Sequence, residues 1–354
     1  MTQARITDVA TAAGVSTSTV SLVLNNRPTR ISETTKERVR AAAEAVGYTP
    51  NSVARGLRTQ RTRMVGLISD TIATTPFAGR MLAGAEEVAR GADHLVILVD
   101  TDGIPEVEDK AIRALASQQV DALIYAAMWH REVELPAGVP ADTVFLDCRP
   151  AGGGFAAVVP DDRAGGRAAV RALVAAGHRR IAYVSPDEDL PPVASELRHQ
   201  GYLDVLAEAG IDPDPALHVS AEVSAAGGSD AIERLLALGP QRRPTAVFCF
   251  NDRVAAGVYR GARRAGLDIP RDLSVVGFDD QAYIASELDP PLTTVALPHY
   301  EMGRWAMEVA LGIREASPED DPHLMMCPMV HRDSIGPPPA AALSAADGGP
   351  VPPQ

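Results

Sequence analysis

The chain of 354 residues has few aromatic residues, no paired cysteines and no long apolar runs. Aromatic residues make up 4% of the sequence and hydrophobic residues 46%, so the core must consist mainly of Ala, Val, Leu and Ile, which favours an α/β protein. Cys148, Cys249 and Cys327 are widely separated and form no CxxC pair, so we expect buried thiols and no metal or redox site. The length exceeds one ordinary core and predicts two or three domains.

Signals for membranes, secretion and catalysis are also missing. No apolar run approaches the roughly 18 residues of a membrane span, and no signal-peptide pattern opens the chain, so we expect a cytoplasmic protein without a membrane partner. The sequence contains no HExxH, GxSxG, P-loop or GxGxxG motif. We therefore expect neither an enzyme nor a bound cofactor.

The net charge of −13 is distributed unevenly along the chain. Residues 1–63 contain ten Lys and Arg against four Asp and Glu, a balance of +6, and the remaining residues contain 23 against 42, a balance of −19. A polyanion such as DNA is therefore attracted to the first segment and repelled by the rest. On charge alone, a solvated positive surface is the alternative explanation.

The basic segment begins with two short amphipathic helices. The inward side chains of the first share the spacing i, i+3, i+4 and i+7: Ile6, Val9, Ala10 and Ala13. Gly14 ends this helix, and Ser16 caps the second. The inward side chains of the second helix are Val20, Val23 and Leu24. Two helices joined by so short a turn predict a helix-turn-helix.

A third helix, expected between Ser32 and Gly47, completes a small core with Val39, Ala43 and Val46. Polar residues and one leucine lie on or beside the outward face of the second helix: Ser16, Thr17, Ser18, Thr19, Ser21, Leu22 and Asn25. This face fits the major groove of DNA, where hydroxyls contact bases or phosphates and Leu22 contacts a thymine methyl group. A generic three-helix packing unit is the alternative.

Two segments, ITDVATAAGVSTSTVSLVLN and ISETTKERVRAAAEAVGYTPNSVARGL, resemble the head of the lactose-repressor/galactose-repressor (LacI/GalR) family. The resemblance runs almost unbroken from Ile6 to Leu57 and implies a DNA-binding transcription regulator. Leu22 departs from the family pattern, because many members carry Arg at that place. The operator sequence therefore does not carry over.

The segment from Pro50 to Arg58 offers barely two turns of weak helix and should not be helical alone. The resemblance implies that it folds when two copies meet on DNA and that Leu57 enters the minor groove and kinks the duplex. Arg55 and Arg58 would then hold phosphates. Without the resemblance, a flexible basic linker is the preferred interpretation.

From Met64 onward, short apolar runs alternate with helical stretches. The predicted strands are MVGLIS, LVILVD, ALIY and VFLD, and then, after a break, IAYVS, AVFCF and LSVVGFDD. Repeated βαβ units predict two doubly wound parallel sheets, with ligands where the carboxyl ends of the strands face a cleft.

Polar residues at these strand ends can hold a hydroxylated ligand, but strand-end Asp and Asn are as often caps of the following helix. The segments RHQGY, AVFCFNDRVAAG and DLSVVGFDD resemble effector-domain signatures of the same family, and the resemblance extends to HRDS near Ser334. It implies effector contacts from the following residues: Ser69, Phe77, Asp147, Arg198, Asn251 and Asp279. Glu222 stands where several sugar-responsive members place an aromatic ring, so stacking on a sugar does not carry over.

These features predict an all-α helix-turn-helix domain (residues 1–49), a hinge (50–62), a bilobed α/β periplasmic-binding-protein-like domain for effector binding and dimerisation (63–335) and a disordered tail (336–354). The expected function is repression of transcription by a homodimer that binds a near-palindromic DNA operator and a small polar effector such as a carbohydrate. Two other classes of protein share the architecture expected for residues 63–335. A transporter's solute-binding protein would not explain the helix-turn-helix domain at residues 1–49, and a nucleotide-cofactor enzyme would need the glycine-rich GxGxxG motif, which is missing.

Overall fold

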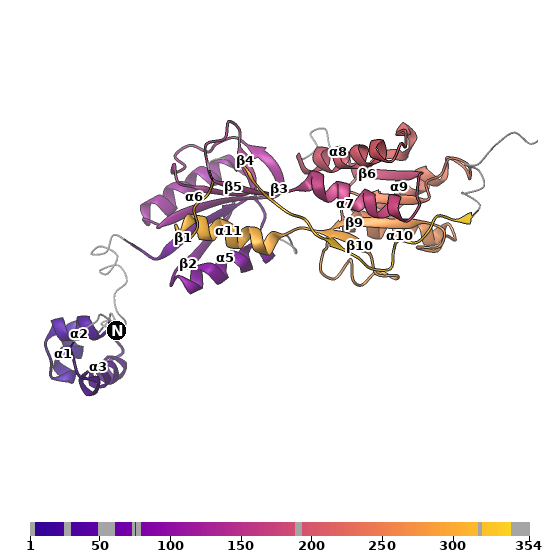
Figure 1. The fold of residues 1–354 in the computed structure, drawn as a ribbon. Coiled ribbons are helices and arrows are strands. Elements are labelled where there is room, and N and C mark those ends of the chain that lie inside the picture. Colours follow the sequence, from indigo (N-terminus) through magenta and orange to yellow (C-terminus); the bar gives the residue numbers. More distant parts are fainter. Residues whose placement is uncertain are drawn as a thin grey trace, which may run out of the picture. The chain divides into compact units, whose positions relative to one another are not determined.

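A computed structural model describes residues 4–24, 30–48, 61–72, 75, 79–187, 193–317 and 321–340. The chain divides into two compact units, Met1–Arg63 and Met64–Gln354 (Figure 1). Among the described residues, no helix is long and apolar enough to cross a membrane.

The first unit contains α1 (Ile6–Ala13), α2 (Thr17–Leu24) and α3 (Glu33–Ala45). Gly14 ends α1 in the left-handed conformation, with φ of 61°, which glycine adopts without steric cost. Ser16 caps α2, because its Oγ accepts a hydrogen bond from the Thr19 backbone N–H at 3.1 Å. The predicted helix-turn-helix is confirmed.

Eight small apolar side chains form the core of this unit: Val9, Ala10, Ala13, Val20, Val23, Val39, Ala42 and Ala43. Three side chains that the pattern placed inward, Ile6, Leu24 and Val46, are only half-buried at its margin. So small a core depends on close helix contacts, which alanine and valine permit.

The second unit consists of two α/β lobes, each built on a six-stranded sheet (Figure 1). The strands of the first lobe are β1 (Met64–Ser69), β2 (Leu95–Asp100), β3 (Ala122–Val133), β4 (Val144–Pro150), β5 (Ala157–Pro160) and β11 (His323–Met325). Its helices are α5 (Gly79–Gly91), α6 (Pro105–Ser117) and α11 (His299–Ala310).

The second lobe repeats this plan. Its strands are β6 (Ile181–Pro186), β7 (His218–Ala221), β8 (Ala246–Cys249), β9 (Ser274–Asp279), β10 (Thr293–Ala296) and β12 (Met329–Val330). Its helices are α7 (Asp162–Ala175), α8 (Val193–Glu208), α9 (Ala225–Leu236) and α10 (Asp252–Arg264), with a short 3₁₀ turn, η1 (Pro215–Leu217).

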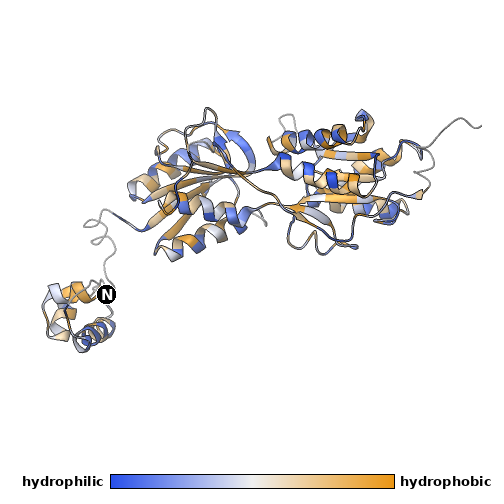
Figure 2. Ribbon diagram, viewed as in Figure 1, coloured by the Kyte–Doolittle hydropathy of each residue, from blue (hydrophilic) through white to orange (hydrophobic). Residues whose placement is uncertain are grey.

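Strand order is β11-β5-β4-β3-β1-β2 in the first lobe and β12-β10-β9-β8-β6-β7 in the second. All pairs are parallel except β10 with β12, which is antiparallel at the sheet edge. The central strands of both sheets are hydrophobic and the covering helices amphipathic (Figure 2). The two doubly wound sheets predicted from the sequence are confirmed, with this one antiparallel edge pair.

The chain passes between the lobes three times: from β5 to α7, from β10 to α11 and from β11 to β12. The edge strand β11 and helix α11 of the first lobe therefore come from the C-terminal part of the chain. Helix α11 supplies Met302, Trp305 and Met307 to the core of the first lobe.

Two segments differ from the sequence-based expectations. The strand expected at ALIY continues as β3 to Val133, and its register with β4 shifts between Ala126 and Arg131. Gly336, expected in a disordered tail, is held by the fold: its N–H donates to Ser274 Oγ at 3.0 Å, and its carbonyl oxygen lies 2.9 Å from His178 Nε2. His178 is thus a structural residue.

Helices α5 and α11 of the first lobe cross at two glycines. A Cβ atom at Gly84 would overlap the carbonyl oxygen of Tyr300, and one at Gly303 would overlap that of Met81. The missing side chains allow the two helix backbones to touch, which brings α11 onto the first lobe.

We expect Gly84→Ala to destabilise the first lobe by about 1–3 kcal/mol, because the added methyl group meets backbone that cannot move away cheaply. Gly91→Ala is the matched control, since Gly91 lies in the same helix with no heavy atom within 4 Å of its Cβ position. The control should be neutral or more stable by up to about 1 kcal/mol. Urea unfolding followed by tryptophan fluorescence measures both, and equal midpoints would contradict the prediction.

Candidate functional site

The predicted DNA-contacting residues on and beside α2 are accessible to different degrees. Ser16, Thr17 and Ser18 are exposed, and Thr19, Ser21 and Leu22 are half-buried. The Ser16 and Thr19 hydroxyls lie 2.9 Å apart, so they already share a hydrogen bond at the start of the helix. Thr17 and Ser18 therefore offer the most open hydroxyls. Four predicted contacts lie outside the described residues: Asn25, Arg55, Leu57 and Arg58.

Three of the predicted effector residues meet between the lobes of the second unit. Asp147 on β4 belongs to the first lobe, and Arg198 on α8 and Asp279 at the end of β9 belong to the second. All three line one small inner cavity. They converge because the carboxyl ends of parallel strands in both sheets face the boundary between the lobes.

Arg198 is fixed by contacts on every side. Its Nε donates to Asp162 Oδ1 at 2.8 Å and its Nη1 donates to the Phe250 carbonyl oxygen at 2.7 Å. Its Nη1 also lies 3.6 Å from Asp279 Oδ1. The guanidinium carbon is 3.6 Å from the ring centroid of Phe278 and 4.6 Å from that of Phe250, within cation–π range.

Asp162, the first residue of α7, carries the negative charge that neutralises Arg198. Its Oδ2 lies 2.9 Å from His130 Nδ1, a residue of the first lobe. Burial raises the pKa of Asp162, but the Arg198 charge and the His130 hydrogen bond outweigh burial and leave the pKa below its usual value. The buried ion pair therefore stays ionised at neutral pH.

The carboxyl groups of Asp147 and Asp279 are less well compensated, since Asp279 has a contact of 3.6 Å with Arg198 and a hydrogen bond from Gln281 Nε2 at 2.8 Å. Burial, and then the charge of Asp162, raise the pKa of Asp147 well above its usual value. Burial raises the pKa of Asp279 to about 6, with Arg198 opposing the shift. His299 Nε2 lies 3.9 Å from Asp147 Oδ2, and burial followed by the Arg198 charge lowers the pKa of His299 to about 4. At neutral pH His299 is uncharged and adds no positive charge beside Asp147.

Asn251 serves the local structure and does not line the inner cavity. Its Oδ1 accepts from the Val254 backbone N–H at 3.0 Å and caps α10, which is the capping role weighed from the sequence. Its Nδ2 and Asp147 Oδ1 are buried and have no hydrogen-bond partner among the described residues. Such unsatisfied groups are costly and point to a missing partner.

Of the two remaining predicted effector residues, only Ser69 belongs to the described residues. Ser69 is buried at the end of β1, where its Oγ donates to Asp70 Oδ1 at 3.2 Å, and it does not line that cavity. Phe77 lies outside the described residues.

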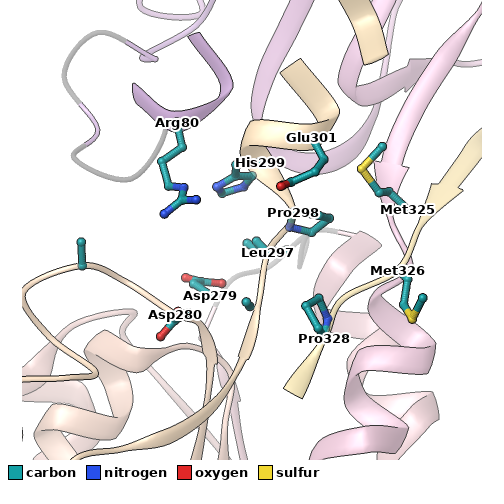
Figure 3. A pocket seen from close by; sticks show the side chains of 12 residues that line it. Arg80, Asp279, Asp280, Leu297, Pro298, His299, Glu301, Met325, Met326 and Pro328 are labelled. Atoms are coloured by element: carbon teal, nitrogen blue, oxygen red, sulfur yellow. The ribbon is translucent and has the colours of Figure 1, made fainter. Parts of the chain in front are cut away.

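A larger cavity of about 490 Å³ adjoins the inner one and shares Asp279 and Leu297 with it. In Figure 3, the Arg80 side chain extends toward Asp279, and His299 and Glu301 line the opposite wall from α11. The volume lies in the range of sites for small metabolites. Residues of both lobes and of the crossing segments line it, so lobe movement changes its shape.

The backbone also turns sharply at the strand ends. Asp147, Asp279 and Asp280 have φ of 57°, 101° and 52°, a region that side-chain-bearing residues rarely adopt. Such strained residues cluster at ligand sites. Three residues of this site were not predicted from the sequence: His130, Asp162 and His299. Only Asp162 had a local signal, since it follows Asp161 directly after the apolar run AVVP.

The raised pKa of Asp279 makes stability depend on pH. Since the folded protein binds the proton more tightly than the unfolded chain, this group's contribution to stability falls as pH rises from about 4 to about 6. The melting temperature of Asp279→Asn minus that of wild type should therefore increase as pH rises over this range and stay constant above it.

Asp204→Asn is the control of opposite sign. Arg163 holds the pKa of Asp204 below its usual value through hydrogen bonds of 2.9 and 3.0 Å, so that carboxylate stabilises the fold above about pH 4. This variant should lose stability relative to wild type as pH rises. Melting temperatures measured from pH 4 to 7 test both predictions. If the melting temperatures of Asp279→Asn and wild type change in parallel with pH, the raised pKa of Asp279 is refuted.

Known proteins match the chain in both units. The pattern of bacterial regulatory proteins of the lacI family matches residues 5–51, and a periplasmic binding protein-like domain matches residues 170–335. The transcriptional regulator RegA of Clostridium saccharobutylicum is 33% identical over 91% of this chain and 96% of its own. The transcriptional regulator GalR of Escherichia coli is 34% identical over 95% of this chain and 96% of its own.

A solved structure supports the same relation. The lac repressor dimer bound to operator and the anti-inducer ONPF has a TM-score of 0.77 and 26% identity, over 95% of this chain and 100% of that one. Because these relatives are transcription regulators, the alternative of a nucleotide-cofactor enzyme is excluded. The helix-turn-helix domain is therefore the DNA-binding domain. The chain belongs to the LacI/GalR family of DNA-binding transcription regulators.

Proposed function

We propose that this regulator is a cytoplasmic homodimeric repressor whose operator affinity is controlled by a small hydroxylated effector bound between the two lobes of Met64–Gln354. In this proposal, residues 1–49 contact DNA, 50–62 form the hinge, 63–335 bind effector and dimerise, and 336–354 form a tail.

The unsatisfied polar groups between the lobes carry the proposal. Among the described residues, Asp147 Oδ1 from the first lobe and Asn251 Nδ2 from the second are buried without a hydrogen-bond partner, and Asp147 lines the inner cavity together with Asp279. A hydroxyl group donates to a carboxylate and accepts from an amide, so a polyol satisfies both kinds of group at once. A ligand that bridges them favours one arrangement of the lobes.

Relatives support this effector class. The ribose operon repressor of Haemophilus influenzae is 33% identical over 87% of this chain. The solved complex of the regulator CelR with cellobiose has a TM-score of 0.65 and 28% identity over 94% of this chain. Both names concern sugars, and sugars are the first effectors to try here.

We propose that the two lobes move about the three crossing segments when the effector binds. When effector changes the angle between the lobes, the paired heads of a dimer change their spacing on a two-fold symmetric operator. The effect is reciprocal, since an effector that weakens DNA binding is itself bound more weakly by the DNA complex.

The double variant Thr17→Ala/Ser18→Ala should lose operator discrimination and keep its fold, because both side chains are exposed. We first select random duplex DNA with the full chain at moderate salt and expect a two-fold symmetric site. The variant should then bind that site at least about tenfold more weakly, with unchanged binding to random DNA. Recovery of sequence-independent, salt-sensitive binding alone from wild type would refute the repressor proposal.

Asp147→Asn should weaken effector binding about tenfold, because it replaces one carboxyl oxygen with an amide N–H donor and preserves side-chain shape. Operator binding without effector should be unchanged. Titration of ribose, glucose and cellobiose into the protein–operator complex, read by fluorescence anisotropy, measures both affinities. The surface variant Asp204→Asn is the control and should respond like wild type. A normal effector response in Asp147→Asn would contradict the assignment of Asp147.

A further inference from the structure

We propose that Trp129 is the aromatic face of the effector site, against which the apolar C–H face of a cyclic sugar lies. This inference rests on the proposed function and specifies the effector as a ring-closed sugar. Glu222, which stands where several sugar-responsive relatives place an aromatic ring, is exposed and lines neither cavity described above.

Trp129 lies among the polar groups of the site. It lines the inner cavity together with Asp147, Arg198 and Asp279. It is only half-buried, although one side packs on the core of the first lobe. It is the one aromatic residue among the described side chains that line this cavity.

An irregular part of β3 places the ring there. Strand β3 shifts register against β4 between Ala126 and Arg131, and the shift falls where Met128, Trp129 and His130 enter the inner cavity. Directly after Trp129, the His130 Nδ1 lies 2.9 Å from Asp162 Oδ2, and Arg131 Nη2 donates to Asp70 Oδ2 at 2.9 Å. These polar contacts fix the backbone that carries Trp129.

Trp129 also bridges the two lobes. Its ring stacks on Phe250 of the second lobe, with centroids 6.2 Å apart and an angle of 29°. The guanidinium carbon of Arg198 lies 4.6 Å from the same Phe250 ring. The inner cavity holds only about 10 Å³, room for no more than a water molecule, so a bound ring must separate Trp129 from Phe250 or reach it from the larger cavity.

The surrounding chemistry favours a sugar ring over an aromatic base. The two carboxyl groups of Asp147 and Asp279 suit a ligand with several hydroxyl groups, because each hydroxyl can donate to a carboxyl oxygen or accept from a protonated one. Sugar hydroxyls meet this need, whereas the ring nitrogens of a purine or pyrimidine are themselves acceptors. One apolar ring face against Trp129 then completes the site.

The test uses the full chain labelled with 5-fluorotryptophan and observed by ¹⁹F NMR. The chain contains two tryptophans, Trp129 and Trp305, and Trp129→Phe assigns the two signals. Trp305 is the internal control, because it lies in the core of the first lobe and stacks on His323 with centroids 5.1 Å apart. Probes are glucose, galactose, ribose and cellobiose, the open-chain alditols sorbitol and galactitol, and adenosine and cytidine.

We expect at least one cyclic sugar to shift the Trp129 signal more than the Trp305 signal. Its alditol should bind at least about tenfold more weakly, because an open chain has no ring face. By calorimetry, Trp129→Leu should weaken sugar binding at least about tenfold, and Trp129→Phe should keep most of it. Far-UV circular dichroism and a cooperative melting curve for Trp129→Leu show that the variant is folded.

Three results would overturn the inference while leaving the proposed function in place: sugar binding that leaves the Trp129 signal unmoved, equal sugar affinity in folded Trp129→Leu, or tighter binding of adenosine or cytidine than of every sugar. Should no probe bind wild type or change its operator affinity, the proposed effector class falls together with the inference.

Discussion

The buried ion pair between Arg198 and Asp162 is the interaction on which the effector domain depends. Asp162 joins it to His130 of the first lobe, and Arg198 joins it to Phe250 and Asp279 of the second. Burying two charges is costly unless every donor and acceptor is satisfied, and losing one partner would leave an uncompensated charge. The pair therefore fixes where the boundary between the lobes can form.

The same pair decides which carboxylates are available to a ligand. Burial raises the pKa values of Asp147 and Asp279, and because Asp162 is the main partner of Arg198, Asp279 has only a longer contact of 3.6 Å with that cation. Asp162 thus has a structural role, and the other two are open to a ligand. Hydroxyl donors can satisfy them at neutral pH without bringing another charge into the interior.

Much of this architecture follows from local patterns. Apolar spacing with Gly14 and Ser16 predicted the first two helices, and alternating strands and helices predicted both sheets. The convergence of Asp147, Arg198 and Asp279 followed from parallel strand ends together with the family resemblance. The capping and ligand interpretations of Asn251 were alternatives in the sequence, yet one amide group can serve both, since Oδ1 caps the helix and Nδ2 has no partner in the part of the chain that the structure describes.

Other parts of the structure could not be predicted from short stretches of sequence. The continuation of β3 past Tyr125 depends on pairing with β4 after a register shift, a tertiary event without a signal in the window around Trp129. His130 was missed for the same reason, because its partner Asp162 is 32 residues away. His299 belongs to a crossing between lobes that the run of strands and helices did not reveal.

The three crossings also set the order in which the protein can fold as it leaves the ribosome. Synthesis delivers β1 to β5 first, but α11 and β11 of the same lobe follow only after nearly all of the second lobe has been made. Until then β5 has an open edge, and the apolar surface that Met302 and Trp305 later cover faces the solvent. The second lobe can gather five of its six strands while the first still lacks α11 and β11, and only β12 of the second lobe is synthesised after these elements.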